Sequence, residues 1–382
     1  MTHTRRRLSL LAVAAAALLP FTALAADPVR IGVLLPLSGG AALAGTEIIE
    51  GVRFAADEAN ARGGVLGRPI QLLVEDDEGS PTKGASAARK LVESEKVVAI
   101  SGSYVSGVTL AETRITRANK IPMVSAGSTA VAVTDANTPG DLWFFRAFPG
   151  SDEQGDQSAE DIIKRLHGKR IAIIHDVSDY GASLARQMTA VAARDGVPIV
   201  ANQSYNSNEQ DFYSLLTQVQ EAKPDTIYVA GLQDAGAMIL RQAGELGIKA
   251  QFVGSGSMMT DKFIELTGPA SEGFAVSSMY EPGTPNPVGH DFGQRFRAKF
   301  GKDADVYSAL GFDSMNVIIE AIRRAGSTDG VAIRNALLTL GDFPLVEGPP
   351  GTTAKFDAKG SVSFKIGLAV VRNGKRAWLP FD

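Results

Sequence analysis

The sequence predicts an α/β protein made of two doubly wound lobes joined by three hinge crossings. Apolar strand patterns alternate with amphipathic helix patterns from residue 29 to about residue 276, which is typical of parallel sheets covered by helices. The alternation forms two successive runs, residues 29–147 and residues 148–278, and each has the size of one domain. Helical patterns without intervening strands follow, so the late chain must pack on a sheet that has already formed.

The first strand and helix show the patterns on which this prediction depends. Residues 29–35 form an apolar run, and Val52, Ala56 and Ala59 then fall on one helical face. Runs that are apolar throughout, such as residues 171–174, are typical of strands buried on both faces of a parallel sheet. The expected strands are residues 29–35, 70–75, 97–101, 121–124, 170–175, 198–202, 225–230, 251–254 and 274–278. The expected helices are residues 46–62, 81–94, 107–119, 153–167, 180–195, 210–222, 233–247, 258–267, 288–300, 307–325 and 328–340.

The last part of the chain is expected to divide between the two lobes. The three late helices should pack on the first lobe. Residues 364–371 form a β-type run, followed by the turn signal Asn373-Gly374, and should return to the second lobe. Crossings are expected near residues 145–150, 277–283 and 343–353. The predicted boundaries are a signal peptide at 1–25, a first lobe at 26–147 plus 279–350, and a second lobe at 148–278 plus 351–382.

The first 25 residues have the pattern of a cleaved export signal. Arg5 to Arg7 form a basic start, an apolar core follows, and Ala23-Leu24-Ala25 is a small-residue cleavage site. The alternative is a membrane anchor, but the apolar core is short for a bilayer span and is interrupted at Pro20. We therefore expect a periplasmic protein. Thr4-Arg5-Arg6 leaves a twin-arginine export route open beside ordinary secretion.

Charge and composition exclude several functions. Cleavage would remove three arginines and no acids, leaving 38 − 3 = 35 Lys and Arg against 42 Asp and Glu, a net charge of about −7. This charge argues against nucleic acid or an anionic membrane as partner. The chain has 0 cysteines, which excludes disulfides and cysteine nucleophiles, and its histidines at positions 3, 167, 175 and 290 have no metal-ligand spacing. No metal and no other cofactor is expected.

Motifs typical of enzymes are also missing from the sequence. No glycine-rich dinucleotide motif follows a strand, and there is no P-loop. Asp76-Asp77 is expected to end a strand and to organise the next turn, and Arg146 is expected to hold the first crossing together. Catalysis is therefore not expected, although an exported enzyme on the same scaffold stays an alternative.

Several motifs together resemble one family of binding proteins. They are VRIGVLLPLSG (residues 29–39), NARGG (60–64), DD (76–77), IHD (174–176) and YG (180–181). They resemble the leucine/isoleucine/valine-binding family of periplasmic solute-binding proteins of ABC transporters, over essentially the whole mature chain. The resemblance implies a monomer that closes two lobes over a small ligand by hinge rotation and delivers it to a membrane permease. A periplasmic sensor module stays open as another role.

Two loops of the first lobe are candidates for binding a carboxylate. One follows strand 97–101 and opens a helix, where free backbone N–H groups suit an anion; the alternative is an ordinary helix cap. The other follows strand 121–124. The resemblance implies that Ser106, Thr129 and the backbone at Gly127 hold the carboxylate of the ligand. The candidate residues of these loops are Tyr104, Val105, Ser106, Gly127, Ser128 and Thr129.

The second lobe supplies the remaining candidates. The resemblance favours Tyr180 as an aromatic contact that covers the apolar part of the ligand; the alternative is local packing beside a helix cap. Two further loops follow strands 225–230 and 251–254. Their candidate residues are Leu232, Gln233, Asp234 and Gly256.

Two positions depart from the family pattern and leave the ligand open. Members that bind amino acids usually carry an acid where this chain has Gly256, and a buried ammonium without a partner costs several kcal/mol. Either Asp234 supplies that charge, or the ligand has no ammonium group. Ala44 stands where an aromatic residue is often found, so the cavity is expected to be roomy and apolar at one end. The expected ligand is thus a branched-chain or other hydrophobic amino acid, and the alternative is an aromatic carboxylate.

Overall fold

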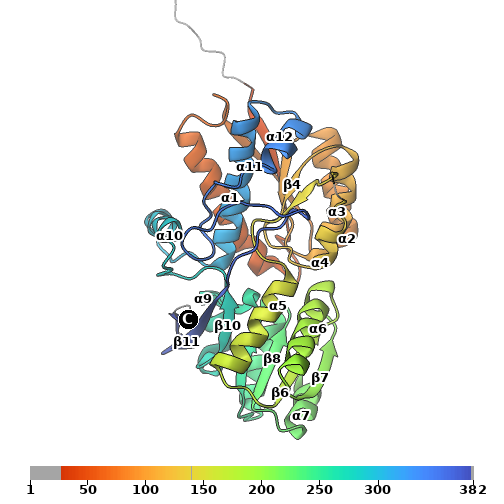
Figure 1. Cartoon of the computed structure of the whole chain (residues 1–382), viewed down its shortest axis with the longest axis vertical. Coiled ribbons are helices and arrows are strands. Elements are labelled where there is room, and N and C mark those ends of the chain that lie inside the picture. Colours follow the sequence, from red (N-terminus) through yellow and green to blue (C-terminus); the bar gives the residue numbers. More distant parts are fainter. Residues whose placement is uncertain (1–26, 139, 380–382) are drawn as a thin grey trace, which may run out of the picture.

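The computed structural model describes residues 27–138 and 140–379, and these form two α/β lobes, one above the other in Figure 1. The predicted signal peptide lies outside the described residues. The first lobe is built on a parallel sheet with strand order β2-β1-β3-β4-β5. Its strands are β1 (Val29–Leu35), β2 (Ile70–Asp76), β3 (Ala99–Gly102), β4 (Met123–Val124) and β5 (Phe144–Phe145).

The second lobe is built on a larger sheet with strand order β12-β11-β10-β9-β8-β6-β7. Strands β6 to β10 are parallel, and β11 and β12 are added antiparallel at the edge next to β10. The strands are β6 (Ile171–Asp176), β7 (Ile199–Tyr205), β8 (Thr226–Ala230), β9 (Gln251–Gly254), β10 (Ala275–Ser278), β11 (Gly367–Arg372) and β12 (Lys375–Leu379). The predicted fold class is confirmed.

Helices cover both sheets, and their apolar faces form the cores predicted from the sequence. The helices that follow first-lobe strands are α1 (Ala42–Ala61), α2 (Pro81–Arg89), α3 (Ser106–Ala118) and the unpredicted α4 (Val131–Asp135). Those of the second lobe are α5 (Ser151–Glu160), α6 (Asp179–Arg194), α7 (Tyr213–Glu221), α8 (Gln233–Glu245) and α9 (Asp261–Thr267). Among the described residues, no helix has the length and apolar character needed to cross a membrane.

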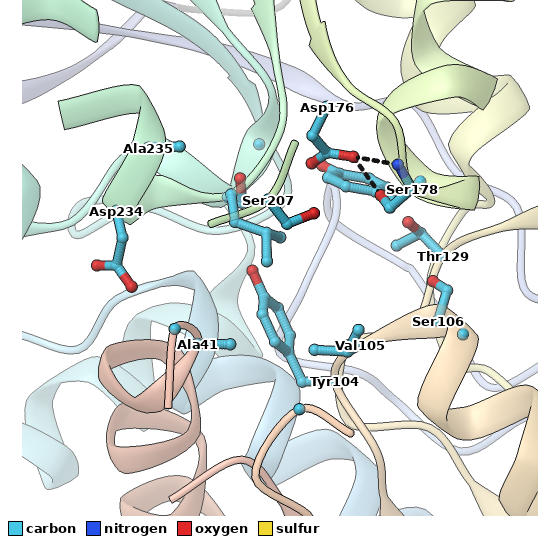
Figure 2. Close-up of a pocket in the computed structure, with 18 of the residues that line it drawn as sticks. Ala41, Tyr104, Val105, Ser106, Thr129, Asp176, Ser178, Ser207, Asp234 and Ala235 are labelled. Carbon is cyan, nitrogen blue, oxygen red and sulfur yellow. Dashed lines mark hydrogen bonds between the residues drawn. The ribbon is translucent and has the colours of Figure 1, made fainter. Parts of the chain in front are cut away.

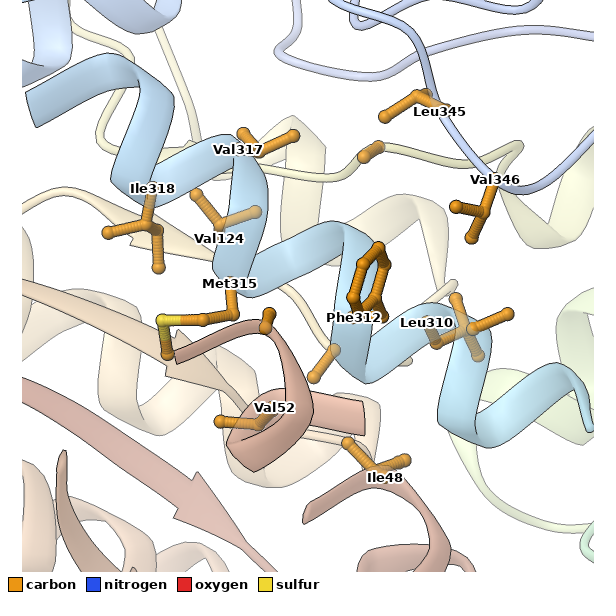
Figure 3. Packing of buried hydrophobic residues seen from close by; sticks show 14 of the residues in the cluster. Ile48, Val52, Val124, Leu310, Phe312, Met315, Val317, Ile318, Leu345 and Val346 are labelled. Carbon is orange, nitrogen blue, oxygen red and sulfur yellow. The ribbon is translucent and has the colours of Figure 1, made fainter. Parts of the chain in front are cut away.

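The late helices return to the first lobe, as predicted. They are α10 (Pro287–Phe300), α11 (Val306–Ala325) and α12 (Gly330–Leu337). Helices α11 and α1 are in close contact. A Cβ atom on Gly51 would stand 1.9 Å from the carbonyl oxygen of Ser308, and a Cβ atom on Gly311 would stand 2.1 Å from the carbonyl oxygen of Ile48. Figure 3 shows the apolar side chains that fill the space around this contact, including Val52, Phe312 and Met315.

The third crossing lies later than the predicted 343–353. The Arg146 N–H donates to the Gly360 carbonyl (2.8 Å), and the Val362 N–H donates to the Arg146 carbonyl (3.0 Å), so this segment still belongs to the first lobe. The Gly/Pro-rich stretch was mistaken for the crossing because it folds back on itself at the isolated bridge between Pro344 and Thr353. The boundaries between the two lobes stay a prediction. The pairing of Arg146 with Gly360 and Val362 would move the last of these boundaries beyond Val362.

Arg146 joins the first crossing to the first lobe, as expected. Its side chain is buried, with Nη1 donating to the Thr129 carbonyl (2.6 Å) and Nε donating to the Ser361 hydroxyl (3.0 Å). Asp76 also has the expected turn-forming role, because its Oδ1 accepts from the backbone N–H groups of Leu37 (2.8 Å) and Glu78 (2.9 Å). Both side chains therefore hold segments of the backbone in position.

Two carboxyl groups are buried together beside the second crossing, where the Gly348 N–H donates to the Met279 carbonyl (2.9 Å). Asp313 accepts from the backbone N–H groups of Val346 (3.0 Å) and Glu347 (3.2 Å). The Glu347 carboxyl is fully buried and has no hydrogen-bond partner among the described residues. Burial raises the pKa of both groups, and the charge of Asp313 raises that of Glu347 further. Glu347 is the member that holds a proton, since Asp313 has the N–H donors that stabilise a carboxylate.

This pair predicts a pH dependence of stability. The pKa of Glu347 is raised in the folded state from its ordinary value of 4.5, so the folded state binds more protons than the unfolded state, and the free energy of unfolding falls as the pH rises above about 4.5. We expect Glu347→Gln to reduce this slope by up to about 1.4 kcal/mol per pH unit, measured by urea denaturation from about pH 5 to about pH 9. The exposed Glu265→Gln is the control. An unchanged slope in Glu347→Gln would show that the group is ionised when folded.

Candidate functional site

A cavity of about 480 Å³ lies between the two lobes. It is bordered by loops that leave the carboxyl ends of strands β3, β4, β6, β7, β8 and β9, together with the start of α11. Ligands of open α/β sheets bind at these strand ends, and the volume is within the range of small-molecule sites, about 300–1,000 Å³. Figure 2 shows the side chains that surround it.

Two first-lobe hydroxyl groups face the cavity and are available to a ligand. The Ser106 Oγ, at the first residue of α3, accepts from the Ala130 N–H (3.2 Å), which leaves its own proton free to donate. The Thr129 Oγ1 is buried and has no hydrogen-bond partner in the described chain, while Arg146 holds the Thr129 carbonyl. Together with the N-terminal end of α3, they make a site suited to a carboxylate. We call these two hydroxyls and the start of α3 the carboxylate clamp.

Of the other predicted residues of this wall, Tyr104 and Val105 line the cavity, Val105 as the N-cap residue of α3. Gly127 and Ser128 have structural contacts. Gly127 lines the cavity, but its N–H donates to the Ser125 hydroxyl (3.1 Å), so this N–H is engaged within its own turn. A Cβ atom on Gly127 would stand 2.6 Å from Cδ2 of Tyr104, so the glycine makes room for that ring. Ser128 does not line the cavity: its hydroxyl is buried 3.1 Å from the carbonyls of both Ser103 and Tyr104. These contacts hold the Tyr104 loop in place.

A chain of hydroxyl groups crosses the cleft. The Tyr307 hydroxyl, on α11, donates to the Ser257 carbonyl of the second lobe (2.7 Å), and the hydroxyls of Tyr104 and Tyr307 lie 3.0 Å apart. A carbonyl oxygen only accepts, so the single Tyr307 proton is used there and Tyr104 must donate to Tyr307. The two rings pack edge to face with centroids 5.5 Å apart. This chain holds the lobes together over the cavity.

The second-lobe wall combines tyrosines with a buried acid. Tyr180 lines the cavity, and burial raises its pKa to about 12. Asp176, at the end of β6, accepts from the Ser178 N–H (2.8 Å) and from the Ser178 hydroxyl. The Tyr205 hydroxyl is buried without a hydrogen-bond partner among the described residues. A Cβ atom on Gly231 would stand 2.1 Å from this hydroxyl and 3.1 Å from Asp176 Oδ2, so glycine is required where they converge.

The remaining predicted residues lie in two second-lobe loops. Leu232, Asp234 and Gly256 line the cavity. Gln233 does not: it is buried, and its Oε1 accepts from the Thr260 hydroxyl (3.1 Å). A side chain at position 256 would begin 2.9 Å from the Ser277 carbonyl oxygen, so this loop has no space for an acid as it is folded.

One expectation about the first lobe was wrong. Ala44 is buried in the core of that lobe and does not border the cavity, whereas Gly40 and Ala41 do. Helix α1 begins at Ala42, four residues earlier than predicted, and this turns Ala44 inward. The first-lobe wall at this point is nevertheless small, as expected.

Sequence reasoning missed Tyr205, Tyr307 and Asp176 as cavity residues. Tyr205 lies beyond the predicted end of its strand at residue 202, and the rule that ligands meet the carboxyl ends of parallel strands would have found both it and Asp176. Tyr307 had no local signal. It reaches the cavity only because α11 packs on the first lobe, a contact between segments far apart in the sequence.

The cavity has acids but no bases. Among the described residues, its lining includes the carboxyl groups of Glu78, Asp176, Glu209 and Asp234, and no lysine, arginine or histidine. Burial raises the pKa of Asp176 and of Asp234. Within the described ranges, no group of three or more His, Cys, Asp or Glu residues is placed to hold a metal ion.

The chain belongs to the periplasmic binding protein family, whose sequence pattern matches residues 28–376. It is 30% identical to the Leu/Ile/Val-binding protein homolog 2 of Brucella abortus (strain 2308) over 336 residues, 88% of each chain. The crystal structure of the leucine-binding protein LivK of Thermotoga maritima is similar, with a TM-score of 0.84 and 30% identity over 92% of this chain and 98% of that one. So is that of a Desulfitobacterium hafniense substrate-binding protein in complex with Leu, with a TM-score of 0.77 and 25% identity over 92% and 100%. Membership implies a periplasmic location and a binding role.

The hydroxyl chain across the cleft predicts a uniform effect on binding. We expect Tyr307→Phe to raise the Kd of every ligand of the wild-type protein by roughly fivefold, because one cross-cleft hydrogen bond of about 1 kcal/mol is lost only in the closed state. Calorimetric titration measures the Kd. Tyr213→Phe, which removes an exposed hydroxyl bonded to Glu245, is the control. An effect that varied strongly between ligands would mean that Tyr307 touches the ligand instead.

Proposed function

We propose that this protein captures a hydrophobic α-amino acid by closure of its two lobes and delivers it to the membrane permease of an ABC transporter. The observation that carries the proposal is the pairing of a carboxylate clamp with a cavity that has acids and no bases. No cofactor and no catalytic step enter this role.

The charges of the cavity favour a zwitterion over a simple anion. A carboxylate at Ser106 and Thr129 would be held by neutral donors, and no cation of the cavity wall would balance it. An anionic ligand would add its charge to that of the four acids, whereas the ammonium of an amino acid is attracted by them. The names of the Brucella and Thermotoga proteins and the bound Leu of the Desulfitobacterium protein agree with an amino acid ligand.

Amino-acid binders that carry an acid in the last loop pair the ammonium of the ligand there. In this chain the partner of the ammonium would lie on a different wall of the cavity. Gly256 has no space for one. Asp176 is the second-lobe carboxylate with a pKa raised by burial that Figure 2 shows on the same side of Tyr104 as the carboxylate clamp. An α-ammonium beside Asp176 would restore its ionised form, whereas Asp234 lies on the other side of Tyr104. Closure would exclude water and strengthen the contacts.

An aromatic carboxylate is the second candidate. It is favoured by the rings of Tyr104, Tyr180, Tyr205 and Tyr307, which all border the cavity, and by the glycine at position 256. Offset or edge-on stacking between a ligand ring and these side chains would contribute about 0.5–1.5 kcal/mol per pair.

Matched ligands separate the two candidates. We expect leucine to bind with a Kd of about 1 μM, near −8 kcal/mol, and phenylalanine to bind as well. Their deaminated analogues, 4-methylpentanoate and 3-phenylpropanoate, should bind at least about tenfold more weakly because the ammonium contact is lost. Calorimetry with benzoate and 4-hydroxybenzoate completes the panel. Equal or tighter binding of the deaminated members would establish the aromatic or simple carboxylate instead, and turnover of any member would support an enzyme.

The carboxylate clamp can be tested without disturbing the fold. We expect Ser106→Ala combined with Thr129→Val to weaken ligand binding by about 2–3 kcal/mol, because both donors to the carboxylate are removed. The free energy of unfolding should fall by about 1 kcal/mol, because the Ala130 N–H loses its hydrogen bond to the Ser106 hydroxyl, whereas the Thr129 hydroxyl has no partner to lose. Thr134→Val, in α4 and outside the cavity lining, is the control. Unchanged affinity would remove these hydroxyls from the site.

A further inference from the structure

The cavity has a second end, opposite the carboxylate clamp. Figure 2 shows Ser106 and Thr129 on one side of Tyr104 and Asp234 on the other. We define the distal end as Asp234, the Tyr104 hydroxyl oxygen and the apolar side chains of Met238, Val306 and Leu310. We propose that the distal end selects ligands that carry a hydrogen-bond donor (a hydroxyl, an amide or an ammonium group) on the end remote from their carboxylate. This inference rests on the proposed function, because the clamp sets the orientation of the ligand.

Asp234 is an acceptor without a donor. Its carboxyl is half-buried at the cavity, near the start of α8, and it makes no hydrogen bond or ion pair among the described residues. No side chain caps the N-terminal end of α8. Burial raises the pKa of Asp234, with no opposing charge to lower it. An ionised carboxylate in such a place is stabilised when a donor from the ligand approaches it.

Tyr104 contributes a second acceptor at the same end. Its proton is used toward the Tyr307 hydroxyl, because Tyr307 itself donates to the Ser257 carbonyl. The Tyr104 oxygen therefore offers the cavity lone pairs only. Burial is the main cause that raises the pKa of Tyr104, and the charge of Asp234 raises it further. Two acceptors on opposite lobes thus face the same space.

The other side chains of the distal end have no hydrogen-bond donor for these acceptors. Met238 follows Asp234 by four residues on the same face of α8, and Val306 and Leu310, on the first turns of α11, also border the cavity with apolar side chains. A purely aliphatic ligand end would displace water from Asp234 and supply no hydrogen bond in return. A ligand with a terminal donor fills the same space and satisfies both acceptors.

A structural role for Asp234 makes a different prediction. Asp234 and Ala41 both border the cavity, and α1 begins just after Ala41 without a side-chain cap. An acid at that helix end would stabilise the closed state whatever the ligand. Such a contact would affect all ligands equally, whereas recognition of a distal donor affects only those that carry one.

The experiment uses ligand pairs that differ only in the distal donor. Calorimetric titration compares norleucine with lysine, phenylalanine with tyrosine, and benzoate with 4-hydroxybenzoate, on the wild-type mature protein and on Asp234→Ala and Asp234→Asn. Asp179→Asn is the matched control, since Asp179 is an exposed acid in the first turn of α6 and outside the cavity lining. The last ligand pair applies if the ligand is an aromatic carboxylate.

We expect the donor-bearing member of at least one pair to bind the wild-type protein at least about tenfold more tightly. Asp234→Ala should abolish that preference without weakening the other member, and Asp234→Asn should keep part of the preference for a hydroxyl but none for an ammonium. Equal affinity within every pair would overturn the inference while leaving the proposed function in place. An equal loss for all ligands in Asp234→Ala would also overturn it, in favour of the contact with α1. Failure of every ligand to bind the wild-type protein would overturn the proposed function itself and the inference with it.

Discussion

The contact between helices α1 and α11 is the constraint on which the architecture of the site depends. Gly51 and Gly311 allow the two backbones to approach to a distance that no Cβ atom would permit. Because α11 comes late in the chain, this contact commits the polypeptide to leave the second lobe, return to the first, and cross again to complete the second sheet with β11 and β12. The second and third crossings thus follow from one helix pair.

The same contact supplies part of the cavity. Val306, Tyr307 and Leu310 lie on the first turns of α11 and reach the cavity because the helix is held against α1. Tyr307 then meets a carbonyl of the opposite lobe and orients the Tyr104 hydroxyl. Packing in the core of the first lobe thus determines which polar atoms face the ligand. It also determines which hydroxyl groups still have a proton to donate to it.

Most of the fold could be predicted from the sequence, because parallel strands buried on both faces read as apolar runs and their helices as periodic ones. The short elements β5 and α4 could not be predicted, since two to five residues have too little pattern.

In the site, Ser106 was found because it stands where a strand ends and a helix begins. Ser128, Gln233 and Ala44 were misplaced relative to the cavity, because a shift of one residue in a loop, or of one turn at a helix start, turns a side chain from the cavity to the core. Residue type alone does not show which of two neighbouring loop residues faces the cavity.

Opposite sides of the cleft use different interactions, and the difference explains how the lobes can move without coming apart. On the hinge side, the side chain of Arg376 from β12 is almost fully buried and contacts Glu281 (3.1 Å) in the second crossing and the Ala304 carbonyl (3.4 Å) before α11. A buried charge that loses its partner is costly, so this contact favours a permanent link at the axis of rotation. On the cavity side the link is the neutral hydroxyl chain from Tyr104 to Ser257, and water replaces a neutral hydrogen bond at a net cost of only about 1 kcal/mol. A strong contact near the hinge and a weak one at the mouth let a few ligand contacts decide whether the cleft is open or closed.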